Sequence, residues 1–87
     1  MKSFGKKLKI ARRQRGFSQQ AVADVLRINR STCSYYESGT IDPSVETIYR
    51  ICRLLNVSAD WMIDPARPET DERIPPFFPD PMEQKAG

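Results

Sequence analysis

Apolar residues recur at helical spacing through the first two-thirds of the chain. Phe4, Leu8 and Ala11 are four and three residues apart, so they share one face of a helix. Ser3 is a suitable N-cap for this helix, and Gly16 is suited to end it. The pattern therefore predicts an amphipathic helix between these two residues.

A second helix is predicted for the stretch SQQAVADVL, which begins with Ser18. Val22, Val25 and Leu26 form an apolar stripe on this helix. Ala23 lies next to the stripe and is small enough for another helix to approach closely. We expect this helix to pack on the first.

A third helix is predicted over RSTCSYYES, with Asn29 as its N-cap and Gly39 at its end. Cys33 and Tyr36 are three residues apart and are expected to face inward. That orientation leaves a set of polar side chains on outward or flanking positions: Arg30, Ser31, Ser34 and Tyr35. Two short helices joined by a tight turn, with polar groups on the second, form the arrangement that inserts into a DNA major groove.

Two further helices complete the predicted domain. Ser44 is expected to cap VETIYRICRLL, and Ser58 is expected to cap ADWMI. The apolar face of the longer of these helices consists of Val45, Ile48, Ile51, Cys52 and Leu55. The sequence thus predicts an all-α domain of five short helices within residues 1–64.

Charge is distributed unevenly along the chain. Residues 1–36 contain nine Lys or Arg and one Asp, a net of +8, whereas residues 37–87 contain five Lys or Arg and ten Asp or Glu, a net of −5. Such a split predicts one basic face, as expected of a protein that lies against phosphates. A basic helix face can also be merely solvated, so the charge alone does not decide between the two interpretations.

Composition excludes several classes of protein. A length of 87 residues suits one small domain, and 39% apolar with 29% charged residues argues against a membrane span and against wholesale disorder. The basic N-terminus is not followed by the apolar stretch of a secretory signal, so we expect a cytoplasmic, nucleoid-associated protein. Cys33 and Cys52 are expected to be buried, reduced thiols, and no metal or other cofactor is expected. Without histidine, a nucleophile paired with a base or a glycine-rich phosphate loop, we do not expect an enzyme.

Five short motifs follow one another in order: GFSQ, Ala23 in the middle of a helix, NRSTCSYYESG, PSVETI and VSADWM. Through them, the sequence from Phe4 to about Ile63 resembles the phage Cro/cI-type (XRE family) helix-turn-helix transcriptional regulators. The resemblance implies a five-helix, lambda repressor-like DNA-binding domain. It also implies a regulator, more specifically a repressor, that binds an inverted-repeat operator in double-stranded DNA as a homodimer.

The resemblance assigns base reading to the beginning of the third helix. Arg30 is the principal candidate, because its guanidinium can donate two hydrogen bonds to guanine O6 and N7. The alternative for Arg30 is a phosphate contact, which would change affinity but not sequence preference. Ser31 and Thr32 belong to the same stretch, although hydroxyl groups at a helix start can instead satisfy backbone groups. The flanking positions are Asn29, Ser34 and Tyr35.

Phosphate contacts are predicted around the second helix. Gln19 resembles the glutamine that in this family bonds a phosphate and braces the recognition helix. The full set of predicted phosphate contacts is Ser18, Gln19, Arg27, Lys7 and Arg13. Arg27 stands where most relatives have glycine, and a left-handed backbone there would cost about 1 kcal/mol. The alternative is a turn of different geometry.

Two further pairs of residues have counterparts in the family. Arg12 and Glu37 resemble the ion pair that ties the first helix to the end of the third. Trp61 and Met62 resemble positions of the last helix where core packing and the dimer contact meet. For Trp61 we favour a place in the core.

Residues 65–87 are rich in proline and contain six of the seven prolines of the chain, so neither a helix nor a central strand is expected there. A solvated tail is one interpretation. The other rests on IPPFFPDPM, in which Ile74, Phe77, Phe78 and Met82 suggest docking on the same domain or on a second subunit. A rival to the regulator hypothesis follows: an antitoxin-type protein that binds a partner through this tail while its domain autoregulates its operon.

Overall fold

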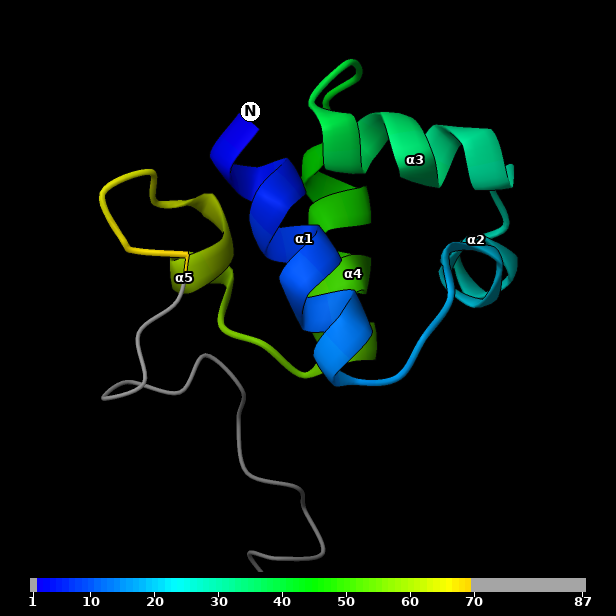
Figure 1. Ribbon diagram of the computed structural model, residues 1–87, viewed down its shortest axis with the longest axis horizontal. Helices are drawn as coiled ribbons and strands as arrows, with labels where there is room; N and C mark the ends of the chain where they lie inside the picture. The colour runs from blue at the N-terminus through cyan, green and yellow to red at the C-terminus, as the bar shows by residue number, and fades with distance from the viewer. Residues whose placement is uncertain (1, 70–87) are drawn as a thin grey trace, which may run out of the picture.

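The computed structural model describes residues 2–69 of the 87-residue chain. This part contains five helices and no β-strand: α1 (Lys2–Gln14), α2 (Gln19–Leu26), α3 (Arg30–Ser38), α4 (Val45–Leu55) and α5 (Ala59–Ile63) (Figure 1). The predicted all-α, five-helix fold is confirmed. Phe77 and Phe78, for which a tail contact was predicted, lie outside the described residues.

Serine hydroxyls begin three of the five helices. Ser18, Ser44 and Ser58 each accept a hydrogen bond from the backbone N–H three residues later, over distances of 3.0 to 3.4 Å. Asn29 occupies the N-cap position of α3, but its side chain makes no capping bond. The prediction for Ser3 is wrong, because α1 already begins at the preceding residue and Ser3 lies in its first turn.

Each helix carries its buried residues on one face, as the apolar spacing predicts. The core consists of Phe4, Leu8, Ala11, Val22, Ala23, Leu26, Cys33, Tyr36, Ile48, Ile51, Cys52, Leu55, Val57, Trp61 and Met62. Both cysteines are free and buried, as predicted.

Two predicted core residues lie on the surface instead. Val25 is 52% exposed, because at 100° per residue it lies about a quarter turn from the face that its neighbours Val22, Ala23 and Leu26 bury. Val45 is 83% exposed, since it is the first residue of α4 and precedes by one turn the first buried residue of that helix.

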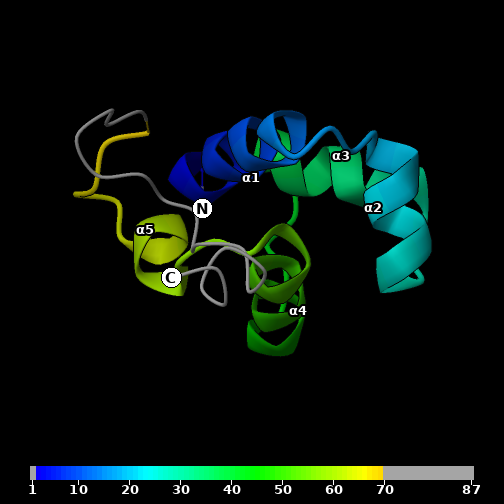
Figure 2. The same ribbon diagram turned by 90° about the horizontal axis from the view of Figure 1, so that it is seen from below.

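The helices pack around α1. In Figure 1, α2 and α3 lie on one side of α1 and α5 on the other, with α4 behind it. Figure 2 shows α4 and α5 as neighbours beneath α1. α1 contacts α3 closely at Gly5, where an added Cβ would lie 2.5 Å from the carbonyl oxygen of Glu37. Any side chain at this position would therefore push α3 away from α1.

The described part of the chain contains neither a membrane-spanning helix nor a cluster of metal ligands. Among residues 2–69, no helix is both long enough and apolar enough to cross a membrane. In the same range, no three His, Cys, Asp or Glu side chains come together as a metal site would require.

Candidate nucleic-acid interface

The turn between α2 and α3 is three residues long and begins with a left-handed backbone. Arg27 has φ 58° and ψ 45°, and its N–H group bonds back to the end of α2. Ile28 donates its N–H to the carbonyl oxygen of Ala23 at 3.0 Å and packs against the core. The turn therefore keeps the conformation that suits glycine, and Arg27 is held there at a cost of about 1 kcal/mol.

α3 has one buried face and one open face. Cys33 and Tyr36 are buried, as predicted, whereas Arg30, Ser31 and Tyr35 are exposed and Ser34 is half-buried. These four polar residues, Arg30, Ser31, Ser34 and Tyr35, line one shallow hollow of about 270 Å³ on the outer face of the helix. The structure thus brings four of the six predicted base-reading residues together on one surface.

The remaining two base-reading candidates lie at the edges of that surface. Asn29 is exposed, and its carbonyl oxygen accepts the N–H of Thr32 at 3.0 Å. Thr32 is half-buried, so less of its side chain is available to a ligand than is the case for its neighbour Ser31.

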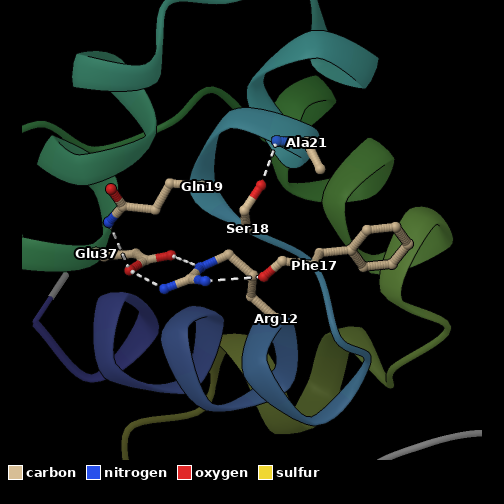
Figure 3. A network of polar contacts seen from close by, with 6 residues as sticks. All are labelled: Arg12, Phe17, Ser18, Gln19, Ala21 and Glu37. Carbon is tan, nitrogen blue, oxygen red and sulfur yellow. Dashed lines mark hydrogen bonds and ion pairs between the residues drawn. The ribbon is translucent and has the colours of Figure 1, made fainter.

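A buried ion pair joins α1 to the end of α3, as predicted (Figure 3). Arg12 Nε lies 2.6 Å from Glu37 Oε2, and the two side chains are only 9% and 5% exposed. A second guanidinium nitrogen donates to Glu37 Oε1 at 3.2 Å, and a third to the carbonyl oxygen of Phe17 at 2.8 Å. Hydrogen bonding to Glu37 raises the pKa of Arg12 in spite of its burial, so this cation stays charged.

Gln19, at the start of α2, joins the same network. Its amide nitrogen donates to Glu37 Oε1 at 3.1 Å, while its amide oxygen points away from the carboxylate (Figure 3). The bracing role that the sequence suggested is thus visible as a contact between α2 and the end of α3. The phosphate contact of Gln19 stays a prediction.

Arg50 holds the other end of α2, and sequence reasoning missed it. Its guanidinium donates to the carbonyl oxygens of Leu26 and Val25 at 3.3 and 3.2 Å. These carbonyls have no partner within the helix, and cations are favourable near a helix C-terminus. Arg15 does the same for α4, bonding the carbonyl oxygens of Leu55 at 2.7 Å and Asn56 at 3.3 Å. The basic residues were visible in the sequence, but which helix end each would reach was not.

Of the predicted phosphate-binding cations, two are on the surface and one is not. Arg13 and Arg27 are exposed. The prediction for Lys7 is wrong, because its side chain is fully buried and its Nζ donates to the carbonyl oxygen of Asp64 at 2.7 Å. The ammonium also lies 5.5 Å from the centre of the Trp61 ring, and burial lowers the pKa of this lysine.

Two large side chains of the last helix, Trp61 and Met62, belong to the core. Trp61 is buried as favoured, and its Nε1 donates to the carbonyl oxygen of Pro68 at 3.0 Å, which attaches the first residues after α5 to the domain. The prediction of a subunit contact through Met62 is wrong, because this side chain has no exposed surface. Ile63 is the large apolar residue that α5 leaves exposed.

The part of the chain that matches known proteins is the helical domain described above. A family model described as "Helix-turn-helix" matches residues 8–62. The chain is 38% identical over 60 residues to the SPbeta prophage-derived uncharacterized HTH-type transcriptional regulator YonR of Bacillus subtilis, covering 69% of this chain and 56% of that protein. It is 38% identical over 61 residues to the HTH-type transcriptional regulator ImmR of Bacillus subtilis, covering 70% of this chain and 48% of that protein. The chain thus spans about half the length of these relatives.

Solved structures give the same fold. The restriction-modification controller protein C.AhdI from Aeromonas hydrophila superposes with a TM-score of 0.66 at 24% identity, covering 71% of this chain and 94% of that one. The SinR protein/SinI protein complex contains a chain with a TM-score of 0.69 at 22% identity, covering 80% of this chain and 69% of that one. At this level of identity the likeness concerns the fold alone.

Proposed function

The chain belongs to the Cro/cI-type (XRE) helix-turn-helix family of transcriptional regulators, which are not enzymes, and on this premise we propose that it binds double-stranded DNA with α3 in the major groove. One observation carries the proposal: the side chains of Arg30, Ser31, Ser34 and Tyr35 share the open face of α3, while its other face is fixed in the core. An α-helix fits the width of the major groove, so this face can reach base edges.

Sequence preference is assigned mainly to Arg30. Its side chain is exposed at the first position of α3, where a recognition helix enters the groove. A guanidinium that bonds guanine O6 and N7 contributes about 1 to 3 kcal/mol of discrimination against other bases. Ser31 and Ser34 line the same hollow and can each contribute one weaker hydrogen bond. Asn29, Thr32 and Tyr35 flank these contacts.

Phosphates are assigned to both ends of α2 and to the end of α1. Ser18 and Gln19 lie at the N-terminus of α2, where the helix dipole and free N–H groups favour anions. Arg27 at the other end of α2 and Arg13 near the end of α1 are exposed cations. Because such contacts release counterions, binding is expected to weaken steeply as salt increases.

We also infer that the protein acts as a repressor and binds as a two-fold symmetric dimer. A dimer of this kind recognises an inverted repeat whose half-sites are about one helical turn, ~34 Å, apart. Ile63 on α5 is the exposed apolar side chain that supports a subunit contact. Analytical ultracentrifugation of the free protein and of its DNA complex would measure how many protein chains each contains.

The decisive experiment selects binding sites from random duplexes for the native protein and for two variants. Arg30→Ala removes the proposed base contact. Arg53→Ala is the matched control, because it removes an exposed arginine of α4 that is not among the residues proposed to contact DNA. We expect Arg30→Ala to lose the preference for guanine at one position of each half-site, and Arg53→Ala to select the native site.

Affinities measured against salt for selected and random duplexes complete the test. A uniform loss of affinity for all sequences in Arg30→Ala would make this residue a phosphate contact. A flat salt response of the native protein, or selection of no common site, would refute the proposal as a whole.

A further inference from the structure

The outer face of α4 exposes a large aromatic side chain that the core does not use. Tyr49 is 60% exposed and lies one turn before Arg53. The guanidinium of Arg53 stands 5.8 Å from the centre of the tyrosine ring and donates to its hydroxyl at 3.2 Å. The pair forms a broad, partly apolar platform on the surface, joined on the α2 side by the exposed Val25.

This platform is one wall of a groove between α4 and the start of α5. A hollow of about 440 Å³ is lined by Tyr49, Cys52, Arg53, Asn56, Val57 and Ala59. A second hollow continues along α4, sharing Tyr49 and Arg53 with the first and reaching Val25, Arg50 and Leu54. We call the two hollows together the α4 groove. Its floor is apolar, because Cys52 and Val57 are both buried.

A third hollow lies between the α4 groove and the end of the described chain. It is lined by Ala59, Asp60, Ile63, Asp64 and Arg67, and it shares Ala59 with the groove. The chain beyond α5 is attached to the domain at this end, through the bond from Trp61 to Pro68 and through Glu69, which lies 3.8 Å from the ammonium of Lys6. The described chain therefore ends two residues after Arg67, which lines this hollow.

We propose that residues 74–82, IPPFFPDPM, of the same chain occupy the α4 groove. Four residues separate this segment from Glu69, and the five steps to Ile74 can span at most about 17 Å. In an extended, proline-rich conformation the nine residues that follow would cover about 28 Å. That length is enough to follow the groove along α4.

The chemistry of the segment matches that of the groove. Proline-rich segments dock on aromatic side chains, because their extended conformation loses little entropy on binding, and Tyr49 is the aromatic residue in the lining of this groove. Phe77 and Phe78 would bury apolar area against the groove floor. Asp80 would meet cations rather than carboxylates, because the described lining of the groove contains two arginines and no acidic residue.

The same chain is a better occupant than another partner for two reasons. The short tether gives the segment a local concentration in the millimolar range, so even weak contacts suffice for docking. The one charged residue of the segment IPPFFPDPM is Asp80, and its negative charge complements the arginines of the groove.

Paramagnetic relaxation in the full-length protein tests the proposal. A nitroxide attached through Lys85→Cys lies three residues beyond Met82. The native cysteines are buried and do not compete for the label, and burial raises the pKa of both thiols. We expect the amide signals of Tyr49, Arg53 and Ala59 to lose most of their intensity, and those on the open face of α3 to keep theirs.

Two variants and a mixing experiment make the result specific. Tyr49→Ser is expected to restore the groove signals, as is the double variant Phe77→Ser/Phe78→Ser. Val45→Ser, on the exposed first turn of the same helix, is the matched control and should leave the effect unchanged. In a mixture of spin-labelled chains without isotope and isotope-enriched chains without label, an intramolecular contact leaves the groove signals intact. If the groove signals are lost in this mixture as well, the occupant is a second copy and the proposal fails. It also fails if no signal is lost, or if the loss lies elsewhere on the domain.

Discussion

Replacing Arg12 by methionine removes the cation on which α1, α2 and α3 converge. The native guanidinium bonds both oxygens of Glu37 and the carbonyl oxygen of Phe17. In Arg12→Met, the Glu37 carboxylate would keep one of the side-chain donors described, the Gln19 amide. The Glu37 side chain would still be only 5% exposed. The variant therefore leaves a buried charge without its counterion.

The expected loss is large for a domain of this size. Breaking a buried ion pair by removing one partner costs about 3 to 5 kcal/mol. For a domain of 60 to 100 residues, each kcal/mol lowers Tm by about 4 to 8 °C, so Tm should fall by at least about 12 °C. Glu37→Met should be similarly destabilised, because it leaves the Arg12 cation buried and unpaired.

A double-mutant cycle separates the ion pair from simple loss of packing. In Arg12→Met/Glu37→Met both charges are gone and apolar groups fill much of the same volume, so the double variant should be at least as stable as either single one. The coupling free energy, measured by urea unfolding followed by circular dichroism, should therefore be at least about 3 kcal/mol.

An exposed ion pair provides the control. Lys6 and Glu69 are 3.8 Å apart, with side chains that are 66% and 42% exposed. Lys6→Met should therefore cost less than about 1 kcal/mol. The role given to the buried ion pair is wrong if Arg12→Met costs no more than Lys6→Met, or if the effects of the Arg12 and Glu37 substitutions simply add.

Three further predictions concern single residues. Arg27→Gly relieves a left-handed backbone at a non-glycine residue, so its free energy of unfolding should rise by about 1 kcal/mol in urea titrations, and an unchanged or lower value would contradict the strain. Lys7→Met should leave the salt dependence of DNA binding unchanged, because Lys7 is buried. Arg13→Met should reduce the slope of log affinity against log salt concentration by about one unit. Equal slopes in these two variants would contradict the assignment of Arg13 as a phosphate contact. Burial, with a contribution from Glu37, raises the pKa of the Cys33 thiol from 9.0 to about 11, so folding keeps it protonated where the unfolded chain ionises. The stabilising contribution of this protonated thiol is present in full below pH 9.0 and is lost as the pH rises toward about 11. Between these two pH values, the free energy of unfolding should therefore fall more in the native protein than in Cys33→Ala. Equal losses would argue against the raised pKa.

The faces of the helices could be predicted from the sequence because local spacing determines them. Cys33 and Tyr36 point inward for the same reason that Phe4 and Leu8 do: residues three or four apart share one side of a helix. The error at Lys7 comes from giving charge priority over spacing. This lysine is three residues after Phe4 and four before Ala11, so its position alone placed it on the core face.

Contacts between distant residues could not be predicted in the same way. Arg50 looks like any other basic residue of an amphipathic helix until the end of α2 is placed beside it. The requirement for glycine at position 5 likewise depends on how closely α1 crosses α3. The Arg12–Glu37 pair was found only because a family resemblance supplied what spacing does not.

Together these contacts hold α3 from the side that faces away from its open surface. Its C-terminal end is fixed by the bonds of Glu37 to Arg12 and Gln19, and its N-terminal end follows a turn that Arg50 fixes from α4. None of these bonds uses Arg30 or Ser31. The residues proposed to read DNA are therefore separate from those that position the helix that carries them, so sequence preference can change at the open face without loss of the fold.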